Sequence, residues 1–245
     1  MKKSIHTLFI LFAIFSTSVK ANNISEATNI INSIVGKCKT EGMLSCEPHI
    51  KEVNIAFDYI RLFNTVSIIE NDFNNFVKNK YSINKPINKA LQASLKLKLN
   101  VTFNPEQFTS GIRDSIKVKD GFDVYMSDGS IYELRNEGNS WVMIFPIEMQ
   151  NKLKQLEPYI VAAKIKRAIL LYRMQEADMA NLSFDKFNEN IGQDLGPLIV
   201  AMFGKDKYPD LAKLATKELN SIINFYSQFS TNQDMIKYIK KDHNL

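Results

Sequence analysis

The sequence predicts an α+β protein that is mainly helical. It has a four- to five-stranded antiparallel sheet in the middle of the chain and an all-helical C-terminal half packed on that sheet. Apolar residues recur every three or four positions in the first and last thirds of the chain, as in helices that bury one face. The central part instead alternates apolar and polar side chains and carries Gly-containing turns, which is typical of strands. Three parts are expected: a signal peptide over 1–21, an α+β region over 22–145 and a helical region over 146–245.

The start of the chain has the layout of a secretory signal peptide. Lys2 and Lys3 give a positive start, residues 8–15 form an apolar run, and residues 16–21 are small or polar and end in Ala21. The apolar run is far shorter than the ~20 residues that span a bilayer. We therefore expect cleavage after Ala21 and a periplasmic or secreted protein, with a retained membrane anchor as the alternative.

Charge and composition exclude some classes of partner. The chain has 31 basic and 26 acidic side chains, and three of the basic ones lie in the leader, so 28 against 26 leave the mature chain a formal +2. A nearly neutral surface lacks the broad positive field that holds nucleic acid, and no nucleic-acid partner is expected. Contact with a membrane is expected only peripherally.

The two cysteines, Cys38 and Cys46, enclose a short loop. In an oxidising compartment such a pair is expected to form a disulfide that ties the first helix to the segment after it. The alternative is a redox or metal pair with His49 as a third ligand, although the spacing lacks the Cys-x-x-Cys form. No metal-ligand set or nucleotide-binding motif is found elsewhere, and no cofactor or metal is expected.

Helices are predicted before the sheet from the spacing of their apolar residues. They cover residues 24–37, 49–70, a short stretch from Phe73, and 84–91. Gly36 is expected to end the first helix, and Glu47 and Pro48 to open the second. Asn71 and Asp72 are expected to interrupt the pattern after the second helix.

The central strands follow from period-two alternation. Residues 95–103 alternate without a fault and predict a strand with one wet and one dry face, and residues 104–113 begin with Asn-Pro and predict a short helix. Asp-Gly and Glu-Gly-Asn turns then separate four strands of an antiparallel meander. These strands cover residues 115–119, 122–126, 131–135 and 140–145. The last strand is apolar on both faces, so helices after Pro146 are expected to cover one of them.

Everything after Pro146 is predicted to be helical. The helices cover residues 147–156, 158–180, 181–203 and a long stretch from Pro209. Gly192 and the pair Gly196-Pro197 are expected to break the third of these. Residues 237–245 are expected to form a solvated, fraying tail.

The order of elements over residues 49–145 is helix, helix, strand, helix and antiparallel meander. The segment from Gly129 to Pro146 consists of a strand, a polar Gly-containing turn and a strand that begins at Trp141. This order resembles the nuclear transport factor 2-like superfamily of α+β cones. The resemblance implies a curved sheet wrapped around the opening helices. It leaves the activity open, because that superfamily includes isomerases as well as non-catalytic binders of ligands or partners.

No catalytic residue is assigned, because the chain lacks a Gly-x-Ser-x-Gly motif and a paired nucleophile and base. One apolar pocket is a candidate binding site, although aromatic and Met side chains on strands are also ordinary core residues. Its candidate ligand-binding residues are Tyr125, Met126, Tyr132, Trp141 and Met143.

Two further candidate sites involve charged side chains. Asp123 or Glu133 is a candidate base inside a cone, with Tyr125 or Tyr132 as hydrogen-bond donor, and the alternative is that both carboxylates lie on a solvated face. A basic stripe is expected on the outer side of the helix over 158–180. It consists of Lys164, Arg167 and Arg173, with Lys166 on the same side.

These observations favour an exported, non-enzymatic protein that binds a partner protein or a hydrophobic small molecule. One alternative is a cofactor-free isomerase or hydrolase that uses a buried carboxylate. The other is a helical adaptor whose basic stripe meets an acidic partner or lipid headgroups.

Overall fold

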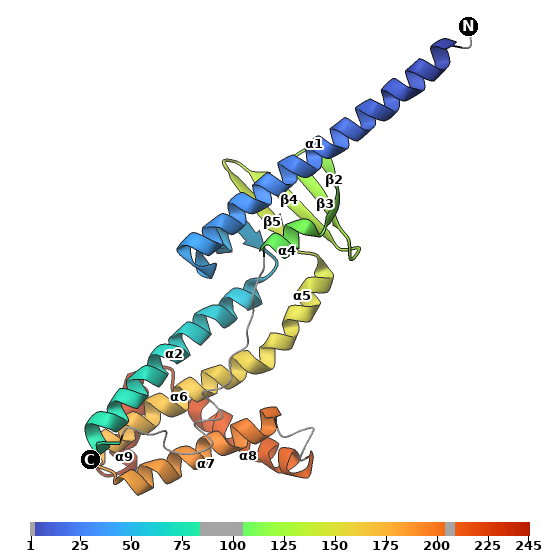
Figure 1. Ribbon diagram of the computed structural model, residues 1–245. Coiled ribbons are helices and arrows are strands. Elements are labelled where there is room, and N and C mark those ends of the chain that lie inside the picture. The colour runs from blue at the N-terminus through green and yellow to red at the C-terminus, as the bar shows by residue number, and fades with distance from the viewer. Residues whose placement is uncertain (1–2, 84–104, 204–208) are drawn as a thin grey trace. The chain divides into compact units, whose positions relative to one another are not determined.

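The computed structural model describes residues 3–83, 105–203 and 209–245 (Figure 1). It divides into two compact units. Unit 1 consists of residues 1–61 and 101–157, and unit 2 of residues 62–100 and 158–245. The division after residue 157 lies further along the chain than the expected one after residue 145. Packing of the helical half on the sheet stays a prediction.

The sheet lies in unit 1 and has five strands in the order β1-β5-β4-β3-β2. Its strands are β1 (Ile50–Lys51), β2 (Ile112–Val118), β3 (Gly121–Met126), β4 (Ile131–Glu137) and β5 (Ser140–Ile144). The predicted meander from β2 to β5 is confirmed, with every neighbouring pair antiparallel. The predicted strand over 95–103 lies outside the described residues.

The prediction of a purely antiparallel sheet is wrong at one edge. Strand β1 pairs in parallel with β5 and places Ile50 opposite Met143, so the sheet is mixed. A strand of two residues is too short to show any alternation, and it is fixed instead by the burial of Ile50, which is 6% exposed. Strand β5 is buried on both faces as predicted, through Val142 and Met143.

Two glycines in the hairpins occupy positions where other residues would be unfavourable. Gly129, between β3 and β4, has φ 85°, a left-handed conformation that other residues rarely adopt. Gly121 starts β3 so close to β4 that a Cβ atom there would lie 1.8 Å from the carbonyl oxygen of Leu134. Gly129 is therefore favoured by its backbone conformation, and Gly121 by the lack of space for a Cβ atom.

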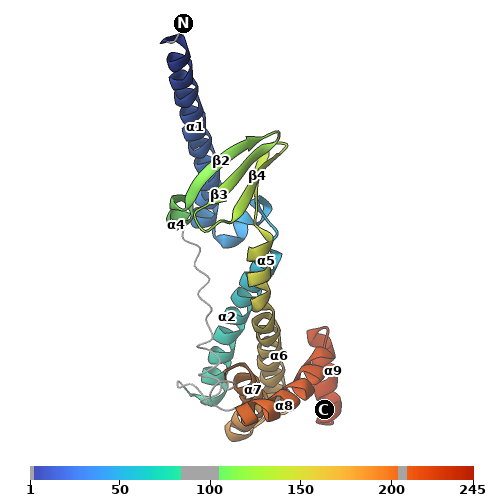
Figure 2. The same ribbon diagram turned by 90° about the vertical axis from the view of Figure 1, so that its right-hand side faces the viewer.

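Helix α1 (Lys3–Glu41) crosses one face of the sheet, as both views show (Figures 1 and 2). Its buried residues Ala27, Ile31 and Ile34 recur at helical spacing and belong to one core with Phe122 and Leu134 of the sheet. Because successive strand residues alternate between faces, the other face of the sheet carries their neighbours in sequence.

The predicted end of α1 at Gly36 is wrong, because the helix continues to Glu41. A single helical glycine costs about 1 kcal/mol, and burial of Val35 and Cys38 on either side of it offsets that cost. The predicted helix opening at Glu47 and Pro48 is also wrong, since both residues lie inside a 3-10 helix, η1 (Met43–His49).

Helix α2 (Asn54–Tyr81) runs without a break through Asn71 and Asp72, where the sequence predicts an interruption. Both side chains are exposed, and Ile69, Phe73 and Val77 continue one buried stripe past them at a spacing of four. The predicted short helices around the sheet are confirmed as α4 (Pro105–Ser110), α5 (Ile147–Leu153) and the 3-10 helix η2 (Lys154–Leu156), the first of them shorter than expected. The predicted helix over 84–91 lies outside the described residues.

Unit 2 packs helices around a core that includes Phe73, Ile169 and Phe187. Its helices after the sheet are α6 (Glu157–Met179), α7 (Phe184–Phe203), α8 (Pro209–Ser227) and α9 (Asn232–Asp242). Helix α7 is unbroken at Gly192 and Pro197, contrary to prediction. An interior proline costs about 3 kcal/mol, and burial of Leu195 and Leu198 around it offsets this cost.

Residues 237–242 of the predicted fraying tail belong to helix α9 instead. Thr231 and Asp234 form a complete capping box at its start, and Met235 and Ile239 are buried one turn apart. The box is Thr-x-x-Asp where the usual form has Glu or Gln, so the sequence signal is weak.

Candidate functional site

Unit 1 contains a partly open cavity of about 460 Å³, within the size range of small-molecule sites. Its apolar wall comes from η1, β1, the first turns of α2, α4, the sheet and α5. The apolar lining residues are Met43, Ile50, Val53, Ala56, Phe57, Ile60, Phe108, Met126, Tyr132, Phe145, Met149 and Leu153, with Cys38 beside them. Such a lining favours an apolar ligand.

Three aromatic rings fix one side of the cavity. Tyr132 of β4 lies edge-on to Phe108 of α4, with ring centroids 4.8 Å apart, and edge-on to Phe145 after β5, at 5.0 Å. Edge-to-face pairs of this kind add about 0.5–1.5 kcal/mol each beyond their buried area. The cavity wall on this side is therefore preformed.

Polar groups gather at one end of the cavity, in the turn between β3 and β4. Asp128 accepts hydrogen bonds at Oδ1 from the backbone N–H of Ser130 (2.9 Å) and from its hydroxyl (2.6 Å). These bonds hold the pKa of Asp128 below its ordinary value. Burial, and then the charge of Asp128, raises the pKa of Tyr132, which keeps its proton at neutral pH.

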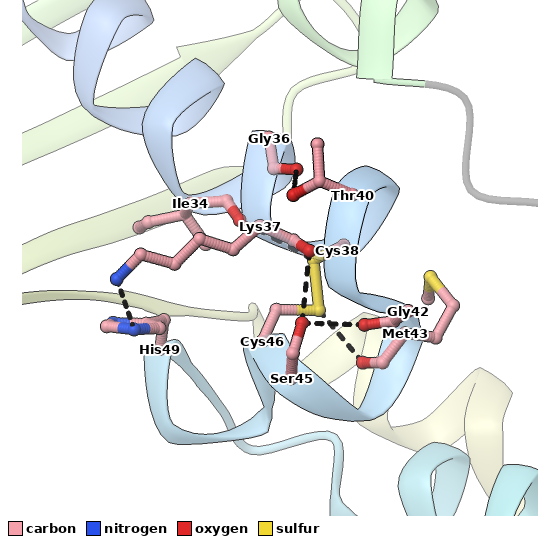
Figure 3. Close-up of a disulfide and its surroundings, with 10 residues drawn as sticks. All are labelled: Ile34, Gly36, Lys37, Cys38, Thr40, Gly42, Met43, Ser45, Cys46 and His49. Atoms are coloured by element: carbon pink, nitrogen blue, oxygen red, sulfur yellow. Dashed lines mark hydrogen bonds between the residues drawn. A yellow bond between two sulfur atoms is a disulfide. The ribbon is translucent and has the colours of Figure 1, made fainter.

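The predicted disulfide between Cys38 and Cys46 is confirmed and joins α1 to η1 beside the cavity (Figure 3). Ser45 strengthens the same corner, where its hydroxyl lies 2.7 Å from the carbonyl oxygen of Gly42 and 3.0 Å from that of Lys37. His49 instead lies 3.1 Å from the carbonyl oxygen of Trp141 through Nδ1. Bonded sulfurs cannot serve as thiolate ligands, so the alternative of a metal site with His49 fails in this state.

The five predicted pocket residues do not lie together. Met126 and Tyr132 line the cavity, whereas Met143 is fully buried in the core beneath the sheet. Trp141 lies outside the lining and packs near Phe122, with ring centroids 6.1 Å apart. Tyr125 precedes Met126 in β3 and therefore points to the opposite face of the sheet.

The lining also includes residues that the sequence does not mark as a site: Phe57, Phe108, Phe145 and the apolar side chains around them. They come from α2, α4 and the segment after β5, and each follows an ordinary amphipathic pattern in its own element. No signal in the sequence brings these separate segments to one cavity.

The two candidate bases do not face the cavity. Asp123 and Glu133 lie opposite each other on the face of the sheet away from α1, and both pair with Arg135 at 2.7 Å. Both are partly exposed. The buried carboxylate that the enzyme hypothesis needs is therefore not supplied by either of them.

The predicted basic stripe on α6 is wrong in part. Lys164 and Arg167 are exposed as expected. Arg173 turns into the helical unit, where Nε lies 2.7 Å from Asp194 and Nη1 lies 2.6 Å from Glu176. Lys166, expected on the same outer side, is also buried and pairs with Glu70 of α2.

Arg173 belongs to a polar network that joins α6, α7, α8 and the end of α9. Tyr226 of α8 donates to Asp194 at 2.5 Å, and His243 after α9 lies 3.2 Å from Glu176. Burial raises the pKa of Tyr226, and the neighbouring Asp194 charge adds to this effect. Burial alone would lower the pKa of Arg173, but the hydrogen bond to Asp194 and the charges of Asp194 and Glu176 together outweigh it, and the pKa is raised. These groups satisfy one another, which is the behaviour of a structural network.

Comparisons with family models, curated proteins and solved structures give no match to this chain. Within residues 3–83, 105–203 and 209–245, no helix is both long and apolar enough to cross a membrane. The same residues hold no group of three or more His, Cys, Asp or Glu side chains that is suited to a metal ion.

Proposed function

We propose that this chain is an exported, non-catalytic binding protein whose unit 1 cavity holds a hydrophobic small molecule. The observation that carries the proposal is the preformed cavity of about 460 Å³, whose wall is apolar except at one end. Burying an alkyl chain gives about 0.8 kcal/mol per methylene group, so a cavity of this kind can bind without any covalent chemistry.

Export is supported by the leader pattern and by the disulfide, a bond that persists in oxidising compartments. The α1 residues that belong to the described core, from Ala27 onwards, all follow Ala21 and stay in the mature chain after the proposed cleavage. The resemblance to the nuclear transport factor 2-like superfamily is part of this proposal, since that superfamily includes non-catalytic binders.

Binding is favoured over catalysis by the ionisable groups in the lining. Asp128 and Tyr132 are the titratable lining residues apart from the bonded Cys38, and their pKa values move away from neutrality in opposite directions. A general acid or base works best with a pKa near the working pH. Neither group is therefore suited to proton transfer at pH 7.

The test is binding of the neutral dye N-phenyl-1-naphthylamine, followed by its fluorescence, to the mature chain. Ala56 lies on the cavity wall, so Ala56→Phe fills the space and is expected to weaken dye binding at least tenfold. Ile116→Phe is the matched control, because Ile116 is 48% exposed and does not line the cavity. Equal dye binding by Ala56→Phe and the unmodified chain, with both folded by circular dichroism, would contradict the proposal.

A further inference from the structure

The polar end of the cavity determines which headgroup its ligand carries. This end is the β3–β4 turn together with Gly111, and its lining groups are Gly111, Ser127, Asp128 and Ser130. The rest of the lining is apolar, so an amphiphile has one orientation in which its chain is buried and its head meets a polar partner.

The two serine hydroxyl groups and four backbone N–H groups at this end already donate within the protein. The Ser127 hydroxyl donates to the carbonyl oxygen of Gly111 at 2.8 Å, and the Ser130 hydroxyl donates to Asp128 at 2.6 Å. The backbone N–H groups of Gly111, Ser127, Gly129 and Ser130 each donate to an oxygen of this same region.

Unused acceptors remain. Asp128 receives both bonds from Ser130 at Oδ1, which leaves Oδ2 to accept from a ligand. The Ser127 oxygen also keeps lone pairs. The charge of Lys152 contributes to the lowered pKa of Asp128. However, Lys152 forms no ion pair with Asp128 within 4.0 Å and does not line the cavity. A carboxylate or phosphate head would bring only acceptors and negative charge to this turn.

On the basis of the proposed function, we propose that the ligand is a single-chain amphiphile with a hydrogen-bond-donating head that is not anionic, an ammonium or hydroxyl group seated against Asp128. The chain lies among Phe57, Phe108 and Phe145, and the head donates to Oδ2 of Asp128. Selectivity against anionic amphiphiles follows from repulsion by the carboxylate and from the donors that are already occupied.

The experiment compares dodecylammonium, 1-dodecanol and laurate at pH 7 as competitors that displace N-phenyl-1-naphthylamine from the mature chain. The chain length is constant, so differences report the head. Asp128 is exposed, which limits its Coulomb contribution, and we expect dodecylammonium to bind about tenfold more tightly than laurate, with 1-dodecanol between them.

The charge is tested with Asp128→Asn. Asn keeps an oxygen that accepts from Ser130, so the turn is retained while the charge is lost. The ratio between dodecylammonium and laurate is expected to fall to within about twofold. Asp120→Asn is the matched control, because Asp120 precedes β3 whereas Asp128 follows it. This variant is expected to keep the full affinity ratio between dodecylammonium and laurate.

The outcomes separate the headgroup assignment from the proposed binding function. Laurate binding as tightly as dodecylammonium, or a ratio that Asp128→Asn leaves unchanged, overturns the headgroup assignment while the binding function stands. If the dye binds but none of the three amphiphiles displaces it, the amphiphile assignment fails. If the dye itself does not bind, the proposed function fails with it.

Discussion

Removing the Cys38–Cys46 disulfide should destabilise unit 1 by an amount that its loop length sets. The cysteines are 8 residues apart, for which the loop-closure relation gives about 2.5 kcal/mol at 25 °C. Replacing both by Ala also removes two buried sulfur atoms, since Cys38 is 5% exposed and Cys46 is fully buried. We therefore expect a total loss of about 2.5–4 kcal/mol in the free energy of unfolding.

The assay is urea unfolding of the mature chain, followed by the fluorescence of Trp141. It is the one Trp in the sequence and it lies in unit 1, half-buried near Phe122, so its signal reports that unit. The control is Ser33→Ala, an exposed position on the same helix, which should change stability by less than about 0.5 kcal/mol.

A loss below about 1 kcal/mol in the double variant would refute the reasoning, because loop closure alone would then be overestimated more than twofold. A second measurement tests whether burial of the sulfur atoms protects the disulfide from reduction. The folded chain should keep its disulfide in a thiol reductant without denaturant and lose it once urea is added. Rapid reduction of the folded chain would show that this corner opens readily.

Three further outcomes are expected. Tyr226→Phe removes a buried donor to Asp194 and should lower the free energy of unfolding of unit 2 by about 1–3 kcal/mol in thermal or urea unfolding. Gly121→Ala should cost more than 2 kcal/mol, because its Cβ atom would overlap the backbone oxygen of Leu134, and a loss under 1 kcal/mol would contradict this geometry. The capping hydrogen bonds from Thr231 lower the pKa of Asp234 in the folded chain, so the stabilisation it provides is present at neutral pH and is lost as the pH falls through that lowered pKa. Asp234→Asn should therefore lower the melting temperature at pH 7 but not at pH 2.

The sequence predicted the elements whose signals are local. The strands from β2 to β5 were predicted within a few residues, because Asp-Gly turns and period-two alternation lie within each hairpin. Strand β1 was missed, since two residues carry no periodicity and the pairing of Ile50 with Met143 is decided by tertiary packing. The continuity of α2 and α7 is not predictable for the same reason. At each potential break, burial of the neighbouring side chains in the tertiary structure offsets the local cost of the helix-breaking residue.

The site was predictable only in part. Met126 and Tyr132 were assigned from their place on the sheet, and the disulfide from the spacing of its cysteines. Strand alternation places Tyr125 and its neighbour Met126 on opposite faces of the sheet, so the two side chains cannot line the same pocket. Arg173 was placed on the wrong side because its charge suggested exposure, whereas Asp194 and Glu176 compensate that charge inside the helices. Glu176 lies three residues further along the same helix, but Asp194 lies on α7 and cannot be inferred from spacing along α6.

The contrast between the two units explains why the proposed ligand site lies in unit 1. In unit 2 the buried charges of Arg173, Glu176 and Asp194 are paired with one another and with Tyr226, so a ligand would have to replace bonds that already exist. In unit 1 the cavity wall is apolar, and the carboxylate at its end keeps an oxygen without a partner among the described residues. Filling this cavity with an alkyl chain and a donating head gains burial and a hydrogen bond without breaking one. The proposed ligand therefore occupies the site where an apolar wall meets an acceptor that the protein itself does not use.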